Sequence, residues 1–174
     1  MKFYIQIIIF SAAFSNLVHA EKIPQFFGQE NQGETMVGSA RVRVLLWDIY
    51  DISLYSPAGH YHPDEPFALR LEYLRPIKGE VIAEKSVEEM RRQGVSELKL
   101  AAWFVQMKEI FPDVNEGSEL IGVFESGKPT VFYNENELIG QIHDPDFQEP
   151  FSKIWLGEKT AKPDVRSILI GENK

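Results

Sequence analysis

The strongest pattern along the chain is a run of β-branched, aromatic and leucine residues between Gly38 and Pro57. Such residues favour β-strands, and the glycine and proline stand at the two ends of the run. Its 20 residues, at roughly 3.3 Å each, would span about 66 Å, several times the usual strand length of about 17–20 Å. We therefore expect two strands, or one sharply bent strand, with the break near Asp48–Asp51. Because no Gly or Pro marks a tight turn there, the pattern favours a bulge or bend over a hairpin.

Further elements follow from the periodicity of apolar positions and from helix-ending residues. In chain order they are a strand over 67–75, helices over 78–93 and 97–111, strands over 120–125, 130–133 and 138–142, a helix after Asp144 and a helix over 163–170. The helix over 97–111 is apolar around most of its circumference, so we expect it to be buried on more than one side. This order of elements predicts an α+β fold with a mostly antiparallel sheet.

The first 20 residues predict an export signal. Lys2 precedes an apolar run over 3–10, and small and polar residues follow as far as Ala20. This is the pattern of a cleavable signal peptide, and the apolar run is short for a membrane span. We expect cleavage after Ala20, a single domain over 21–174 and a periplasmic location. An uncleaved N-terminal anchor is the alternative.

The chain is acidic, with a formal net charge of −8, and it contains no cysteine. An acidic chain without a basic cluster argues against nucleic acids and anionic membrane surfaces as partners, and we expect no stable membrane insertion once the signal is removed. The absence of cysteine excludes disulfides, thiol catalysis, zinc–thiolate sites and iron–sulfur clusters. No cofactor is predicted.

Two groups of polar residues could carry metal or acid–base chemistry, and each has a plainer interpretation. His60, His62 and the neighbouring acidic residues lie in the polar loop 58–66, where alternate histidines can converge on one ion only if the loop holds them together. We interpret this as a polar loop and predict no metal site. Asp48 and Asp51 would point to opposite faces of a regular strand, so we expect surface carboxylates or ion-pair partners.

Arg41 and Arg43 are the candidates with the most specific chemistry. In a regular strand they fall on one side together with Leu45, Trp47 and Ile49. A guanidinium on an apolar face is costly unless it holds a carboxylate, and it does so best through two parallel hydrogen bonds. That carboxylate belongs either to the protein or to a ligand, and the residues leave both possibilities open.

Short motifs spread along the chain carry a family resemblance. In order they include GSAR, WDIYDISLYSP, LEYLR, IFPDVNEG and FSKIWLGEK. Together they resemble the bacterial chalcone isomerase-like proteins, exported relatives of plant chalcone isomerase and of plastid fatty-acid-binding proteins. The resemblance implies an open-faced β-sandwich, in which helices pack on one face of a large antiparallel sheet and a ligand cleft lies between them.

The resemblance also implies where a site would lie. The arginine of the plant enzyme matches Arg41 best, with Arg43 as the alternative, and its strand threonine matches Tyr50. The other members of the catalytic set, a tyrosine, an asparagine and a second threonine, fall near Lys78 and Lys85 and on Ile154. Arg41, Arg43 and Tyr50 are therefore the predicted ligand-binding residues.

Three hypotheses of function follow. The first is a non-catalytic binder of a small hydrophobic acid such as a fatty acid, with Arg41 or Arg43 holding the head group. The second is an intramolecular lyase or isomerase of the chalcone isomerase type, in which Arg41 stabilises an oxyanion and Tyr50 assists. The third is a structural or interaction module without a ligand, in which Arg41 is paired internally. We favour binding, because only the arginine and one hydroxyl of the catalytic set are kept.

Overall fold

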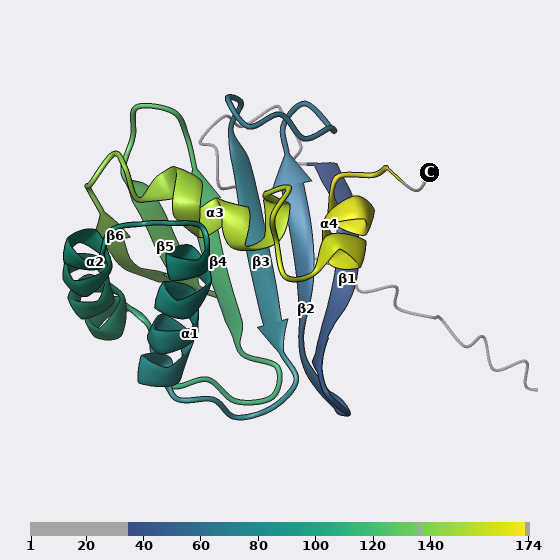
Figure 1. Ribbon diagram of the computed structural model, residues 1–174. Helices are drawn as coiled ribbons and strands as arrows, with labels where there is room; N and C mark the ends of the chain where they lie inside the picture. The colour runs from purple at the N-terminus through teal and green to yellow at the C-terminus, as the bar shows by residue number, and fades with distance from the viewer. Residues whose placement is uncertain (1–34, 136, 173–174) are drawn as a thin grey trace, which may run out of the picture.

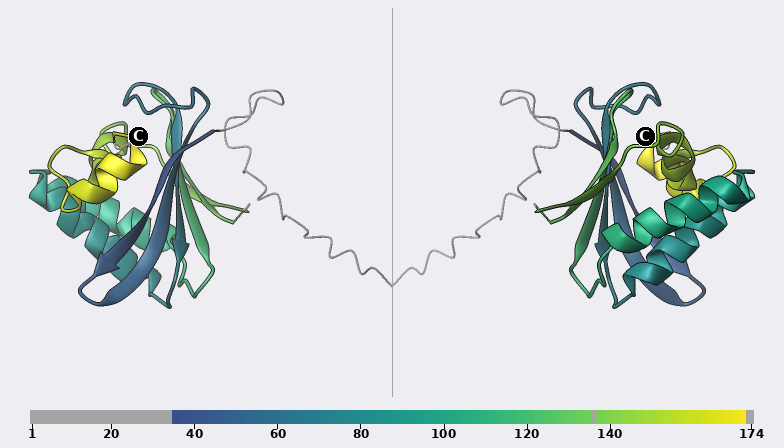
Figure 2. Two further views of the ribbon diagram at one scale, coloured as in Figure 1. Left: turned by 90° about the vertical axis from the view of Figure 1, so that its right-hand side faces the viewer. Right: turned by 90° about the vertical axis from the view of Figure 1, so that its left-hand side faces the viewer.

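The computed structural model describes residues 35–135 and 137–172, which form a six-stranded antiparallel sheet and four helices (Figure 1). The strands are β1 (Thr35–Val44), β2 (Trp47–Ser56), β3 (Phe67–Tyr73), β4 (Glu119–Phe124), β5 (Thr130–Asn134) and β6 (Glu137–Ile142). The helices are α1 (Gly79–Arg92), α2 (Glu97–Ile110), α3 (Gln148–Leu156) and α4 (Pro163–Leu169). The strands lie side by side in chain order, and all four helices cover one face of the sheet (Figure 2). The predicted α+β class is confirmed, whereas the predicted signal peptide lies outside the described residues.

The stretch between Gly38 and Pro57 forms a hairpin, which the sequence did not predict. Val44 pairs with Trp47, so the turn consists of Leu45 and Leu46 alone. Leu45 has a φ of 56°, in a region that glycine and asparagine normally occupy in such turns. The prediction missed the turn because neither of these residues marks it.

A β-bulge lies where the strand break was predicted. Val42 pairs with Tyr50 and the next residue, Arg43, pairs with Asp48, so Ile49 is an extra residue on β2. The bulge shifts the alternation of side chains along β2 by one position. Asp48 and the residue three positions later, Asp51, therefore point to the same face of the sheet, contrary to the expectation for a regular strand.

Strand β3 shows the two environments that the sheet offers. Leu69, Leu71 and Tyr73 are buried on the side of the helices, whereas Arg70 and Glu72 lie on the outer face. This is the alternation that the sequence predicts for a half-buried strand. The main core is therefore an apolar layer between the sheet and the helices, and a smaller buried cluster of Tyr55, Ala68, Ile121 and Val123 lies apart from it.

Helix α2 is buried on one side only, which corrects the prediction from its apolar composition. Leu100, Trp103 and Met107 are buried, but Leu98 is 84% exposed and Val105 is 55% exposed. The helix packs beside α1 and near β6 at the edge of the molecule, so its far side meets solvent (Figure 1). Within the described ranges, no helix is long and apolar enough to cross a membrane.

Gly38 allows α4 to pack directly on β1. A Cβ atom at this position would lie 2.2 Å from the carbonyl oxygen of Ile168, closer than any real contact. We expect Gly38→Ala to lower the free energy of unfolding by about 1–3 kcal/mol, because backbone must move away from backbone. Urea denaturation measures this, with the exposed neighbour Ser39→Ala as a control that removes only a solvent-exposed hydrogen bond from Ser53 and should therefore cost less. Equal stabilities of the two variants would contradict the close packing.

Candidate functional site

A cavity of about 250 Å³ lies between the sheet and the helices. Side chains of β1 to β5 form one wall, and side chains of α1, α3 and the connection between α3 and α4 form the other. The lining is mostly aliphatic and aromatic, as in small-molecule sites, whose volumes run from roughly 300 to 1,000 Å³. The cavity is therefore apolar like a small-molecule site, but slightly smaller than most.

The floor of the cavity is fully apolar and buried. Leu69 and Leu71 project into it from β3, because the strand alternation directs them towards the helices. Phe124 and Phe132 enter from the next two strands, and Phe151 enters from α3, with its ring centroid 5.5 Å from that of Phe132. These aromatic rings pack against one another, so this end of the cavity offers only apolar surface.

The mouth of the cavity is marked by the lining residues that solvent reaches. Val44 is 51% exposed and Val81 is 40% exposed, and Lys85, Ala161 and Lys162 are also exposed. These residues come from the β1–β2 hairpin, from α1 and from the connection between α3 and α4. The cavity therefore opens where these three segments meet.

Two tyrosines bring hydroxyl groups to the cavity wall. The Tyr50 hydroxyl accepts a hydrogen bond of 2.9 Å from Nε1 of Trp155, which ties β2 to α3. The Tyr73 ring packs edge-on against the Tyr50 ring, with 5.7 Å between the two centroids. Burial raises the pKa of Tyr50 to about 12 and raises the pKa of Tyr73 as well. Both groups are therefore neutral at physiological pH and can donate a hydrogen bond to a ligand.

Two lysines carry positive charge at the mouth. Lys85 Nζ lies 2.5 Å from a carboxylate oxygen of Glu88, and this contact raises the pKa of the lysine. Lys162 Nζ donates to the carbonyl oxygen of Arg43 at 2.6 Å. The mouth also includes Glu89, which pairs with an arginine of α1. Both lysines are exposed, so their flexible chains can turn towards an anion at the mouth.

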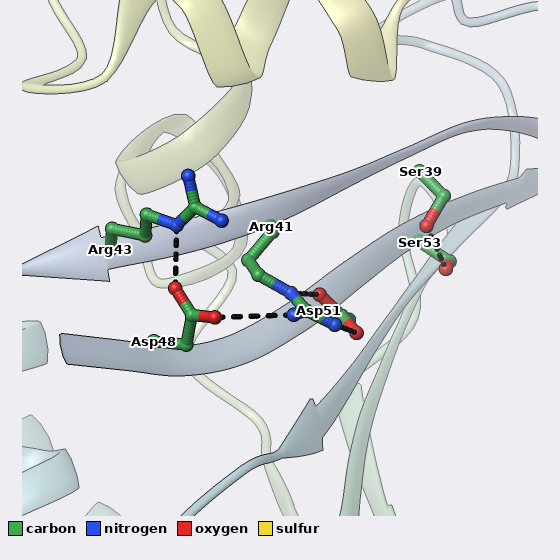
Figure 3. Close-up of polar contacts among 6 residues, drawn as sticks. All are labelled: Ser39, Arg41, Arg43, Asp48, Asp51 and Ser53. Carbon is green, nitrogen blue, oxygen red and sulfur yellow. Dashed lines mark hydrogen bonds and ion pairs between the residues drawn. The ribbon is translucent and has the colours of Figure 1, made fainter.

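Arg41 and Arg43 lie on the outer face of the sheet and do not line the cavity. Figure 3 shows them beside Asp48 and Asp51. Arg41 donates two hydrogen bonds to the Asp51 carboxylate, from Nε at 2.7 Å and from Nη2 at 2.8 Å. Its Nη1 donates to Asp48 at 3.1 Å. Arg43 Nε donates to the other oxygen of Asp48 at 2.5 Å. The pKa of Asp51 falls chiefly because of Arg41, and that of Asp48 chiefly because of Arg43. The carboxylates that hold these arginines thus belong to the protein.

The expected apolar face around the two arginines does not exist. β1 ends before Leu45, and the residues that alternate with the arginines, Val42 and Val44, are the ones that line the cavity. Among the three predicted ligand residues, Arg41, Arg43 and Tyr50, the cavity wall contains Tyr50. Sequence reasoning missed Lys162, which comes from a connection far along the chain and carries no local signal.

The positions that the family resemblance matched to catalytic residues mostly do meet in space. Tyr50, Lys85 and Ile154 all line the cavity, although they come from β2, α1 and α3. Lys78 lies outside it and pairs with Asp113 at 2.5 Å. The matched positions therefore surround one cavity, but with different side chains.

The loop histidines stay apart from this site. His60 lies 3.5 Å from Glu65, and His62 lies 3.9 Å from Asp64, all on exposed side chains. Within residues 35–135 and 137–172, no group of three or more histidine and acidic side chains is placed to hold a metal ion.

Comparisons with known proteins place the chain in a family. A family model described as chalcone isomerase-like matches residues 18–171. No sequence among curated proteins matches the chain. Among solved structures, the crystal structure of a fatty-acid binding protein of Arabidopsis thaliana is similar, with a TM-score of 0.63 and 12% sequence identity over 83% of this chain and 89% of that one. At this identity the similarity shows the fold, and the family model, which covers most of the chain, shows that the protein belongs to the chalcone isomerase-like family.

Proposed function

We propose that the protein binds a small hydrophobic carboxylic acid, such as a fatty acid, and does not convert it. The observation that carries this proposal is the cavity itself, which has a buried apolar floor and two lysines at its mouth. An amphipathic acid needs this combination, because its tail leaves water while its head group stays close to solvent. The fold that the chain shares with a fatty-acid binding protein supports the same function.

The head group in this proposal meets Lys85 and Lys162 instead of the arginines. Charge-assisted hydrogen bonds from two ammonium groups suit a carboxylate at the mouth. The neutral hydroxyl of Tyr50 adds a donor further inside, on the wall of the cavity. The tail then points towards Phe124 and Phe132 on the floor.

The cavity volume bears on the length of the tail. At about 250 Å³ it falls below the range of roughly 300–1,000 Å³ that is usual for sites of drug-sized ligands. This favours a short acyl chain, or a longer one whose end remains outside the mouth. The ligand is thus a compact amphiphile.

The isomerase alternative receives less support from the same geometry. It requires an arginine to stabilise an oxyanion beside Tyr50, and no arginine of the described residues lines the cavity. Burial raises the pKa of Tyr50 to about 12, so its hydroxyl is protonated at neutral pH and could assist only as a hydrogen-bond donor. Binding therefore ranks above catalysis.

We also propose that the protein acts after export. The support is the basic residue Lys2 followed by the apolar run over 3–10 and the small residues before Glu21. The match to the family model begins at residue 18, close to the proposed cleavage position. The binding function does not depend on this location.

Export predicts a defined new N-terminus. When the full chain is expressed in a Gram-negative host, the periplasmic fraction should contain protein that begins at Glu21, since cleavage follows Ala20. Intact-mass measurement of that fraction tests this. A mass that retains residues 1–20, or recovery from the cytoplasm alone, would contradict the proposal.

Ligand binding predicts stabilisation by fatty acids. At about 100 times its dissociation constant, a bound acid adds about 2.7 kcal/mol and raises Tm by about 5–10 °C. Thermal melts with saturated acids of increasing length measure this, and native mass spectrometry after purification shows any lipid already bound. Leu71→Trp is the control, because its larger indole narrows the cavity and should reduce the shift. A clean apo mass together with no shift for any acid would rule the proposal out.

The mouth lysines predict selectivity for the acid head group. Replacing both in Lys85→Gln/Lys162→Gln should weaken binding of a fatty acid roughly 10- to 100-fold, the loss expected for hydrogen bonds to a charged group. Binding of the corresponding fatty alcohol should stay unchanged, as titration calorimetry will show. Arg41→Gln, on the outer face, is the matched control and should bind the acid as the wild type does. If Arg41→Gln weakens binding and the lysine variant does not, the anchor is the arginine.

A further inference from the structure

The turn of the β1–β2 hairpin carries four consecutive large apolar residues in solvent. Val44 is 51% exposed, Leu45 92%, Leu46 94% and Trp47 61%. Single exposed apolar residues are common on protein surfaces, but a contiguous apolar group at a projecting end marks an interaction site. We call these four residues the apolar tip.

The backbone holds the apolar tip away from the rest of the protein. The two-residue turn has Leu45 at a φ of 56°, where leucine is strained and a glycine or asparagine would be relaxed and polar. Both leucines of the turn are almost fully exposed, so this strain serves no packing within the described residues. Figure 2 shows the hairpin curving towards the helix side, with its turn at the lower end of the molecule.

Positive charge gathers around the apolar tip. A hollow beside it has Arg41, Arg43, Arg75 and Asp48 as its charged lining residues. Arg41 and Arg43 are paired with Asp48 and Asp51, so Arg75 supplies the excess positive charge there. On the cavity side, Lys162 is held against the hairpin by its bond to a β1 carbonyl oxygen. The chain as a whole has a net charge of −8, so this concentration of cations is local. Anionic head groups attract such cations at a membrane surface.

Trp47 and Arg75 form a pair suited to an interface between water and lipid. The Arg75 guanidinium lies 4.5 Å from the centroid of the Trp47 ring, so the cation covers one face of the indole. Tryptophan prefers the head-group region of a bilayer, and arginine can reach phosphate from there while its stem stays in apolar surroundings. Leu45 and Leu46 extend beyond this pair.

The apolar tip adjoins the mouth of the cavity. Val44 belongs to both, and Lys162 lies at both the mouth and the hairpin. A surface that received the tip would therefore lie against the opening of the cavity. A bilayer is also where hydrophobic acids accumulate.

We propose that the apolar tip inserts into the surface of a bilayer that contains anionic lipids, and that the cavity takes up its hydrophobic acid from that surface. The uptake rests on the proposed binding function, whereas the docking does not. Four side chains fall short of the roughly 800 Å² that each partner contributes to a stable protein interface. An apolar projection with cations at its base instead matches peripheral membrane anchors, in which apolar burial and charge attraction add together.

Flotation with lipid vesicles tests the docking. The mature protein should float with vesicles of phosphatidylcholine and phosphatidylglycerol and should dissociate as salt is raised. Leu45→Ser/Leu46→Ser should reduce the bound fraction at least tenfold, and Arg75→Gln should reduce it less. Leu98→Ser is the control, because Leu98 is 84% exposed and belongs to α2, which lies on the other side of the molecule from the β1–β2 hairpin in Figure 1. All the substitutions are at surface positions, and unchanged Tm values will verify folding.

Two outcomes would overturn the docking proposal. One is a wild type that does not float, or a tip variant that floats as well as Leu98→Ser. The other is a concentration-dependent dimer in sedimentation that the tip variant abolishes, which would make the tip an interface between copies of the chain. Fatty-acid binding in solution keeps the two proposals distinct. The tip variant should bind a soluble acid normally, and a wild type that floats but binds no acid would refute the binding function alone.

Discussion

The helices cover one face of the sheet and leave the other open, and the surroundings of each strand residue depend on this asymmetry (Figure 2). Neighbouring side chains on a strand point to opposite faces, so each strand sends alternate residues into the apolar layer and to the outer face. On β1 this rule directs Val42 and Val44 to the cavity and Arg41 and Arg43 to the outer face. Charges that look misplaced in an apolar run are thus in the wet half of an ordinary strand.

The bulge at Ile49 shifts the alternation of side chains along β2 by one position. It places Asp48 and Asp51 on the same outer face, where both carboxylates hold Arg41. These pairs are exposed, so they neutralise charge and align β1 with β2 without adding much stability. The same shift keeps Tyr50 on the cavity wall, where Trp155 fixes its hydroxyl. One extra residue therefore puts both carboxylates on the outer face while Tyr50 stays on the cavity side.

The function that we propose uses both ends of this cavity. Its buried floor of leucine and phenylalanine side chains suits an apolar tail, and its mouth combines lysines with the base of an apolar hairpin turn. A fatty acid and a membrane surface both combine apolar chains with anionic head groups. Both would therefore contact the protein at the mouth of the cavity. The acidic net charge gives no indication of these cations at the hairpin. Arg43, Arg75 and Lys162 are far apart in sequence and come together only in the folded chain.

The sequence by itself determined the α+β class and the positions of most elements, because periodicity and helix-ending residues are local signals. It also singled out Tyr50, through a resemblance carried by short motifs. Only the tertiary structure decided that Leu45 and Leu46 make the turn, that α2 has one buried side and that the arginines face outward. Each of these depends on strand register or on which face a distant helix covers, and neither leaves a mark in neighbouring residues. The cavity and the lysines at its mouth are likewise products of packing between segments that are remote along the chain.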